Sequence, residues 1–372
     1  MTRTANIIRS LSVIALMVLF LLPMAGHLLT ADKDVSTVEN RTLQTRPAWT
    51  GNWTSYRKSF DIYLNDQFGF RGLGIKADNQ LKLVFEGELP LVVLGQQDWL
   101  FLSEPALWNS YQGKTFTPET VDSWLESLRN LKAAFEENGA QFYAMIPPNK
   151  ARIYPEHAPI HYGAPGPHLL AALFADSRAD DLDLINVMPP LLSQKETAQV
   201  YYRTDTHWTS IGAYQAYAAF IETVNAKGGN VRLLGQDKLK PKRVQDREGD
   251  LFRLFAKSDF ETDTLLDFTP PAAAGFGPRK FDKKSAAPEG LRPKIFQKKA
   301  PETTLVIIGD SFSDRLIPLL KHSFDKIVIV HHQEGAFTVD DVLKYDPDFV
   351  LFAPVERFGE KLTIFPADIA PN

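Results

Sequence analysis

Residues 304–313 read Thr-Leu-Val-Ile-Ile-Gly-Asp-Ser-Phe-Ser, and the rest of the chain is organised around them. The first five are mostly apolar and β-branched, which predicts a strand buried on both faces of a sheet. The pattern breaks at Gly309-Asp310, and Ser311 follows. A serine on a sharp strand-to-helix turn is held out of the sheet near free backbone N–H groups, which suits a nucleophile. Gly-Asp-Ser is also ordinary turn chemistry, so the prediction needs a base elsewhere in the chain.

The composition is that of a globular protein. The chain has 372 residues, of which 44% are hydrophobic and 23% charged, enough for one large domain or two modest ones. A net charge of −4 gives no reason to expect a nucleic-acid partner. The absence of cysteine excludes disulfides, thiol nucleophiles and thiolate metal sites, and we expect no cofactor.

The N-terminus predicts export. Arg3 and Arg9 precede or flank the apolar run Leu11–Leu22, a pattern typical of a segment inserted with its N-terminus inside. The run alone is shorter than the roughly 20 residues of a full membrane span, so the less apolar residues after it must be counted in. We expect residues 1–30 to be an uncleaved signal-anchor; the alternative is a signal peptide cleaved after Ala31.

The remainder predicts a tether and one α/β domain. Residues 31–60 are a polar tether, and residues 61–372 form the domain. Trp53–Leu64, which crosses the boundary between them, can form a short amphipathic helix. Strands and helices alternate in the domain, which predicts a mostly parallel sheet with helices on both faces and a site at the carboxyl ends of its strands. Residues 228–300, rich in Lys, Pro and Gly, are expected to be an irregular excursion outside the core. Two short strands around a turn are expected within 92–101, and further strands at 141–146, 183–187, 304–308, 326–330 and 349–352. One helix is expected to open at Thr117–Glu119 and to stop at Gly139, and others at about 169–175 and 211–224.

Asp205-Thr206-His207 can supply the base. An aspartate two residues before a histidine can accept from one ring nitrogen and fix the tautomer, while the other nitrogen faces a nucleophile. Of the eight histidines, only His207 has a carboxylate at this spacing. His331-His332, at the end of a predicted strand, is the rival, although two strand-end side chains on opposite faces are the simpler interpretation. A catalytic His207 requires its ring within about 3 Å of the Ser311 hydroxyl.

Taken together, the two motifs resemble those of the alginate O-acetyltransferase AlgJ/AlgX family, also called the DHHW group, which has a circularly permuted SGNH-like fold. In an ordinary SGNH or GDSL esterase the serine block comes first and the histidine block last, whereas here the order is reversed. The length after Ser311 resembles the shorter, membrane-anchored AlgJ type, which lacks the additional carbohydrate-binding domain of AlgX. The blocks that carry the resemblance are Glu39–Arg41, Asp66–Arg71, Asp98–Phe101, Ile146–Pro148 with Lys150, Asp205–Thr209, Gly249–Leu251 and Gly309–Ser313.

The resemblance implies that Ser311 is the nucleophile, His207 the base and Asp205 the residue that orients it. It also implies transfer of acetyl groups to exopolysaccharide hydroxyls in the bacterial periplasm, from a donor handled by a membrane-bound O-acyltransferase. The oxyanion hole needs the backbone N–H of Ser311 and a second donor. Asn149, after a neighbouring strand, is one candidate, although it can equally be a turn residue after Pro147-Pro148.

Three other functions use the same residues differently. A secreted serine esterase that removes acetyl groups would have the same three catalytic residues. In a scaffold of a polysaccharide export assembly, Ser311 would only be a turn residue. A metal site on Asp205, His207 and His331 is the most remote alternative, and we predict no metal.

Overall fold

The computed structural model describes residues 32, 35–36, 41–49, 51–69, 71, 74, 77–78, 89, 91–255, 260–285, 287–332 and 337–358. The chain divides into two compact units, Met1–Pro90 with Phe252–Asp259, and Leu91–Leu251 with Phe260–Asn372. The division thus falls at residue 90, whereas the sequence placed the start of the domain at residue 61. The expected signal-anchor at 1–30 lies outside the described residues. Among the helices that are described, none has both the length and the apolar character needed to span a membrane.

Within its described residues, the smaller unit contains the helix α2 (Trp53–Asp66), which confirms the helix expected from Trp53. The Asn52 side chain caps it by accepting a hydrogen bond from the Ser55 N–H at 3.1 Å. At its other end, the Asp66 carboxylate accepts from the Gln44 N–H at 2.8 Å. Two short antiparallel strands, β1 (Val35–Ser36) and β2 (Arg41–Thr42), precede the helix.

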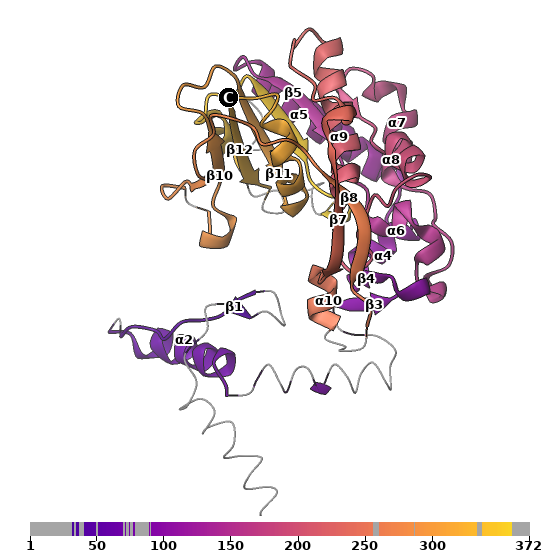
Figure 1. Cartoon of the computed structure of the whole chain (residues 1–372). Coiled ribbons are helices and arrows are strands. Elements are labelled where there is room, and N and C mark those ends of the chain that lie inside the picture. Colours follow the sequence, from indigo (N-terminus) through magenta and orange to yellow (C-terminus); the bar gives the residue numbers. More distant parts are fainter. Residues whose placement is uncertain are drawn as a thin grey trace, which may run out of the picture. The chain divides into compact units, whose positions relative to one another are not determined.

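The larger unit is built on a seven-stranded sheet, counted over the described residues, with the order β6-β5-β13-β11-β12-β10-β9 (Figure 1). The strands from β6 to β12 in this order pair in parallel, and β10 and β9 continue the sheet antiparallel. The mostly parallel sheet is therefore confirmed. The strands are β5 (Gln141–Met145), β6 (Leu184–Ile185), β9 (Lys280–Phe281), β10 (Lys294–Gln297), β11 (Thr304–Gly309), β12 (Lys326–His331) and β13 (Phe349–Ala353).

The strand β11 lies inside this sheet and is buried along its whole length, between β12 and β13. Side chains alternate between its two faces, so Leu305 and Ile307 join one hydrophobic cluster while Val306 and Ile308 join the other. The carboxyl end of β11 is Gly309, paired with His331 and Ala353. Ser311 therefore emerges at the edge where ligands bind in open α/β sheets.

Helices cover both faces of the sheet, as expected (Figure 1). Residues of α8, α9 and α11 belong to the cluster that contains Leu305, and residues of α5, α7 and α12 to the cluster that contains Val306. The helices of this unit are α4 (Pro105–Tyr111), α5 (Pro118–Glu136), α6 (Lys150–Ile153), α7 (Leu169–Ala175), α8 (Met188–Lys195), α9 (Ser210–Ala226), α11 (Ile317–Leu320) and α12 (Val339–Leu343); α10 (Asp250–Phe255) begins in it.

The prediction that residues 228–300 are irregular is wrong. They form a long antiparallel ribbon of β7 (Lys240–Arg247) and β8 (Asp263–Thr269), followed by β9 and β10 at the edge of the main sheet. The ribbon is largely exposed, so its strands carry charged residues and a proline instead of the apolar alternation that reveals a half-buried strand. A smaller hairpin of β3 (Val92–Leu94) and β4 (Leu100–Leu102) confirms the predicted strand pair near residue 95.

Candidate active site

Ser311 stands exposed on the turn after β11. The Asp310 side chain caps this turn by accepting from the Phe312 N–H at 2.9 Å, and the short helix Ser311–Arg315 follows. The other Asp310 oxygen accepts from the Val355 N–H at 2.8 Å, which ties the turn to the residues after β13. Phe312 and Ser313, the two residues after Ser311, are buried. The serine is thus held out of the sheet, as its sequence context predicts.

Asp310 is fixed electrostatically as well as by hydrogen bonds. Burial alone would raise the pKa of Asp310, but the His332 ring, Arg357 and the two backbone N–H groups outweigh it and lower the pKa. His332 Nε2 lies 3.6 Å from Asp310 Oδ2, and the ring is fully buried. The rings of His331 and His332 are 4.6 Å apart, so the expectation that they lie on opposite faces of the strand is wrong. His332 follows the last residue of β12 and leaves the strand alternation there.

The structure brings Asp205, His207 and Ser311 into one hydrogen-bonded chain. His207 Nε2 lies 2.7 Å from Ser311 Oγ, and His207 Nδ1 lies 2.7 Å from Asp205 Oδ1. With Nδ1–H donating to Asp205, Nε2 is left as the acceptor for the Ser311 hydroxyl. The expected approach of His207 to Ser311 is confirmed, and the arrangement can remove the serine proton and hold the resulting imidazolium.

Asp205 is held as a carboxylate. Its Oδ2 accepts from Arg247 Nη2 at 2.6 Å, and its Oδ1 also accepts from the His207 N–H at 2.9 Å. Burial alone would raise the pKa of Asp205, but the hydrogen bond and charge of His207 and the charge of Arg247 keep the pKa well below its usual range. The group is therefore ionised at neutral pH, as an orienting carboxylate must be.

Two buried charges hold the loop that carries Asp205 and His207. The Lys150 ammonium donates to the carbonyls of Tyr202, Arg203 and Asp205 at 3.2, 3.0 and 2.8 Å. Burial lowers the pKa of Lys150 to about 8, with nearby carboxylates acting in the opposite direction. From the ribbon, Asp263 accepts from the Arg203 and Thr204 N–H groups at 2.8 and 3.1 Å and from the Thr204 hydroxyl. Sequence analysis missed these supports; Lys150 lies in a family block, but Asp263 and Arg247 carry no local signal.

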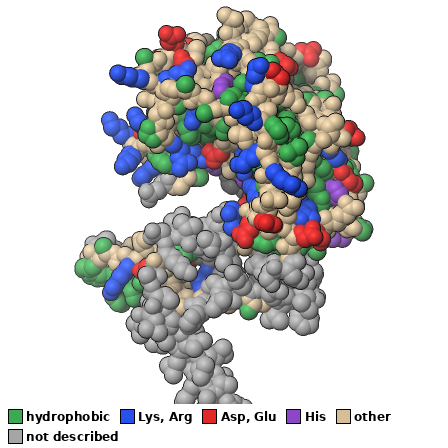
Figure 2. All heavy atoms as spheres, in the orientation of Figure 1, with side chains coloured by type: hydrophobic (Ala, Val, Ile, Leu, Met, Phe, Trp, Pro, Cys, Tyr) green, Lys and Arg blue, Asp and Glu red, His purple; other side chains and the backbone are tan. Residues whose placement is uncertain are grey.

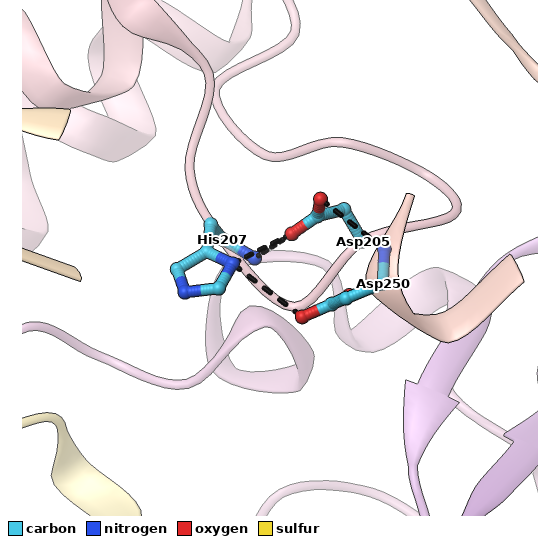
Figure 3. Close-up of side chains that lie close together, drawn as sticks. All are labelled: Asp205, His207 and Asp250. Atoms are coloured by element: carbon cyan, nitrogen blue, oxygen red, sulfur yellow. Dashed lines mark hydrogen bonds and ion pairs between the residues drawn. The ribbon is translucent and has the colours of Figure 1, made fainter. Parts of the chain in front are cut away.

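Asp250, at the start of α10, is the third polar residue around His207 (Figure 3). Ligand atoms of Asp205, His207 and Asp250 lie within 4.8 Å of one another, a grouping that could in principle hold a metal ion. Their oxygens and Nδ1 already hydrogen-bond to one another and to Arg247, Thr206 and backbone N–H groups. The grouping fits an oriented imidazole better than a metal site, and His331, which the metal alternative required, is not part of it.

Asn149 occupies the N-cap position of the short helix α6, but its side chain makes no capping hydrogen bond. Its backbone N–H donates to Glu356 at 2.8 Å, and its Oδ1 is buried without a hydrogen-bond partner among the described residues. Asn149 does not line the pocket that contains Ser311. Its assignment as an oxyanion donor stays a prediction.

A pocket of about 250 Å³ opens beside Ser311. Its lining includes Arg292, Lys294, His331 and Arg357 as well as Ser311. Figure 2 shows Lys and Arg side chains at several places on the visible face of this unit. Asp310 is the single carboxylate among the lining residues, and Lys294 is paired at 2.7 Å with Asp314, which does not line the pocket. The lining still has more basic than acidic side chains, which favours an anionic ligand group next to the serine.

Comparison with known proteins adds a family to this geometry. Residues 92–345 match the family described as SGNH hydrolase-like domain, acetyltransferase AlgX. The probable alginate O-acetylase AlgJ of Pseudomonas syringae pv. tomato is 33% identical over 171 residues, which cover 44% of this chain and 40% of the relative. That of Pseudomonas fluorescens is 26% identical over 311 residues, 79% of this chain and 72% of the relative.

The chain spans about two fifths of the length of the first of these relatives. Among solved structures, Bacillus cereus PatB1 superposes with a TM-score of 0.54 at 15% identity, covering 76% of this chain and 98% of that one. At that identity the likeness concerns the fold alone.

Proposed function

The chain belongs to the family of SGNH hydrolase-like acetyltransferase domains typified by AlgX, and on this premise we propose that it transfers acetyl groups to hydroxyls of an exopolysaccharide. The observation that carries the proposal is the chain of 2.7 Å contacts from Asp205 through His207 to Ser311. The serine lies at the carboxyl edge of the sheet, where the fold places ligands. In this order of motifs, the fold would be a circular permutation of an ordinary SGNH esterase.

In the first half-reaction, Ser311 Oγ attacks the carbonyl carbon of an acetyl donor while His207 Nε2 takes the hydroxyl proton. The imidazolium formed is stabilised by Asp205. When the tetrahedral intermediate collapses, the bond to the donor's leaving group breaks and that group takes the proton from His207. The product is an acetyl ester on Ser311, with neutral His207 restored.

In the second half-reaction, a sugar hydroxyl attacks the acetyl-serine carbonyl and gives its proton to His207 Nε2. Collapse of this intermediate breaks the bond to Ser311 Oγ, which takes the proton back. In both steps the oxyanion would be met by the Ser311 N–H, with Asn149 as the proposed second donor. Attack by water in place of the sugar would make the protein an esterase, and the same residues serve both reactions.

An alginate-like, acidic polysaccharide is the acceptor that we propose. The relatives bear the name alginate O-acetylase, and the pocket beside Ser311 is lined by Arg292, Lys294 and Arg357, which suit carboxylates along a polymer. We further propose that a membrane-bound O-acyltransferase supplies the acetyl group.

We also propose that the protein acts in the periplasm, held to the inner membrane by residues 1–30. The support is the basic and apolar pattern of this segment. Carbonate extraction of membranes from cells that express the full chain tests this, because an uncleaved anchor stays in the pellet. Recovery of the protein in the extract, with an N-terminus at residue 32, would show a cleaved signal peptide instead.

The test of the function compares wild type with Ser311→Ala and, as a control, Ser193→Ala, an exposed serine on α8. p-Nitrophenyl acetate and an oligouronate are supplied together, and acetylated sugar is measured by mass spectrometry. We expect transfer by wild type and the control, and none above background by Ser311→Ala. Free acetate as the sole product, with or without sugar, would favour the esterase, and unchanged turnover in Ser311→Ala would exclude both reactions.

A further inference from the structure

Asp250 reaches the same ring nitrogen of His207 that Asp205 binds. Asp250 Oδ2 lies 3.5 Å from His207 Nδ1, while Asp205 Oδ1 lies 2.7 Å from it (Figure 3). The two carboxylates come from different elements, since Asp205 lies in the loop before α9 and Asp250 begins α10. The proposed mechanism uses only the first of them.

Thr206 links Asp250 to the imidazole. Its hydroxyl donates to Asp250 Oδ2 at 2.6 Å and lies 3.1 Å from His207 Nδ1. Because the single hydroxyl hydrogen is directed at Asp250, the oxygen presents a lone pair to Nδ1–H. Asp250 Oδ1 also accepts from the Thr206 and Leu251 N–H groups at 2.8 and 2.7 Å. The carboxylate is thus fixed in position beside the ring.

The two carboxylates near the His207 ring differ in their own partners, because among the described residues Asp205 is paired with a cation and Asp250 is not. Arg247 lies 2.6 Å from Asp205 and offsets much of its charge at the imidazole. Asp250 makes no ion pair within 4 Å among the described residues except the one to His207. When Nε2 takes up a proton, the charge of the imidazolium is therefore stabilised by one carboxylate that is already paired with a cation and by one that is not.

The other elements packed around His207 add few charges. Lys150 of α6 bonds the Asp205 carbonyl, and Ser311 contacts Nε2. Phe312 packs on the ring with centroids 5.0 Å apart, and Arg357 lies on Phe312, 5.6 Å from its centroid. Removing Asp250 would thus leave Asp205, which is already paired with Arg247, as the one carboxylate in contact with the His207 ring among the described residues, and the imidazolium would become less stable.

We propose that Asp250, acting with the Thr206 hydroxyl, is a second positioning carboxylate that stabilises protonated His207 and keeps its ring oriented when Asp205 is absent. The inference deepens the proposed function and rests on it for its kinetic part. It assigns a positioning role to a residue that does not line the pocket beside Ser311. His207 would then be stabilised by two carboxylates, Asp205 and Asp250, of which Asp205 also pairs with Arg247.

The experiment compares Asp250→Asn, Thr206→Val and the control Glu261→Gln, whose carboxylate is exposed, in the full-length protein. The pH–rate profile of p-nitrophenyl acetate turnover is measured for each. In Asp250→Asn we expect kcat to fall about 10-fold with little change in KM. The acid limb of the profile should move about one unit to lower pH, since loss of a nearby negative charge makes the imidazolium easier to deprotonate. In Thr206→Val the acid limb should also move to lower pH, but by less than in Asp250→Asn, and in the control Glu261→Gln it should not move.

The second carboxylate also predicts non-additivity. Because Asp250 must support the ring alone when Asp205 is absent, Asp250→Asn should lower kcat by more in the Asp205→Asn background, about 100-fold, than the roughly 10-fold expected in wild type. A role in folding alone would lower the amount of active protein but leave the midpoint of the acid limb in place, and that result would overturn the inference. If Asp250→Asn does not fold, folded Thr206→Val is measured in its place, and an acid-limb midpoint equal to that of wild type would overturn the inference.

A readout independent of turnover separates this inference from the proposed function. The His207 ring protons are titrated by NMR in wild type and Asp250→Asn. A midpoint that moves to lower pH in the variant supports the second carboxylate even if wild type transfers no acetyl group. Equal midpoints in the two proteins exclude it even if wild type is an active transferase.

Discussion

The turn that carries Ser311 and the loop that carries His207 meet at one site but are built in different ways. The turn follows β11, a strand buried along its whole length, and is closed by the Asp310 side chain. The loop Tyr201–Thr209 has little regular structure, apart from one isolated bridge between Tyr201 and Trp208. The position of Ser311 is therefore set largely by its own strand and turn, whereas the position of His207 depends on side chains from distant segments.

Buried polar groups show this dependence directly. The carbonyls of the loop are bound by Lys150 of α6, and its N–H groups by Asp263 of β8 and Asp250 of α10. In a regular element the neighbouring backbone would satisfy these groups, and here side chains from distant segments do so. The Trp208 indole N–H, which donates to the Phe312 carbonyl at 3.2 Å, joins the loop to the turn.

The strongest test of the difference is Asp263→Ala. This carboxylate accepts from two N–H groups and the hydroxyl at the start of the loop, and Arg247 lies 3.9 Å from it. Removing one partner of a buried, hydrogen-bonded charge typically costs about 3–5 kcal/mol. We expect a loss of that size in the free energy of unfolding, measured by urea titration, together with loss of acetyl transfer.

The matched control is Thr264→Ala, the next residue on β8, whose side chain is exposed. A surface substitution of this kind should stay within about 0.5 kcal/mol of wild type. Equal losses in the two variants would show that the ribbon stabilises the protein generally and does not specifically hold the histidine loop.

The difference between the Ser311 turn and the His207 loop also explains which parts of the site could be predicted from the sequence. The strand 304–308, its break and the exposed Ser311 follow from local pattern and turn chemistry, and Asp205 and His207 stand out by their spacing. Residues 228–300 carry no apolar alternation because the ribbon is solvated, so the contribution of Asp263 and Arg247 to the site had no local signal. Lys150 was noticed only as part of a family block, since a buried lysine cannot be distinguished from an exposed one in sequence.

Two glycines, one on each side of the site, give a second comparison. A Cβ on Gly249 would overlap the Thr204 carbonyl oxygen in the histidine loop, where backbone must move. A Cβ on Gly309 would meet the Ser313 side chain, which can rotate, and the Ala353 carbonyl oxygen at 3.1 Å. Overlap with backbone that must move lowers the free energy of unfolding by about 1–3 kcal/mol, so we expect Gly249→Ala to lose an amount in that range. For Gly309→Ala we expect a loss of no more than about 1 kcal/mol.

Urea titration gives both values, and Gly277→Ala, where the nearest atom is 3.9 Å from the added Cβ, serves as the control. Transfer activity should fall more in Gly249→Ala than in Gly309→Ala, although the second glycine is closer in sequence to Ser311. The reverse order would mean that the turn, and not the loop, is the less adaptable half of the site.

The Ser311 turn and the His207 loop should both lose stability in acid, because each contains a carboxyl with a lowered pKa. Asp205 in the loop and Asp310 in the turn both have a pKa lowered in the folded protein, because His207 and Arg247, and His332 and Arg357, outweigh burial. A carboxyl whose folded pKa lies below its unfolded value, near 4, contributes stability that is present above that value and is lost as the pH falls through and below it. Between pH 7 and 5 neither group should change the stability.

Between pH 4 and 3 Asp205 should account for about 1 kcal/mol of lost stability, since the unfolded state takes up a proton there that the folded state does not, and Asp310 should add a loss in the same direction. Urea titrations of wild type, Asp205→Asn and Asp310→Asn at pH 5, 4 and 3 measure this, with each variant expected to decline less steeply than wild type. If only Asp310→Asn flattened the decline, the pKa of Asp205 would not be lowered in the folded protein. His207 and Arg247 would then not stabilise the Asp205 anion, contrary to the charge pairing described for the loop.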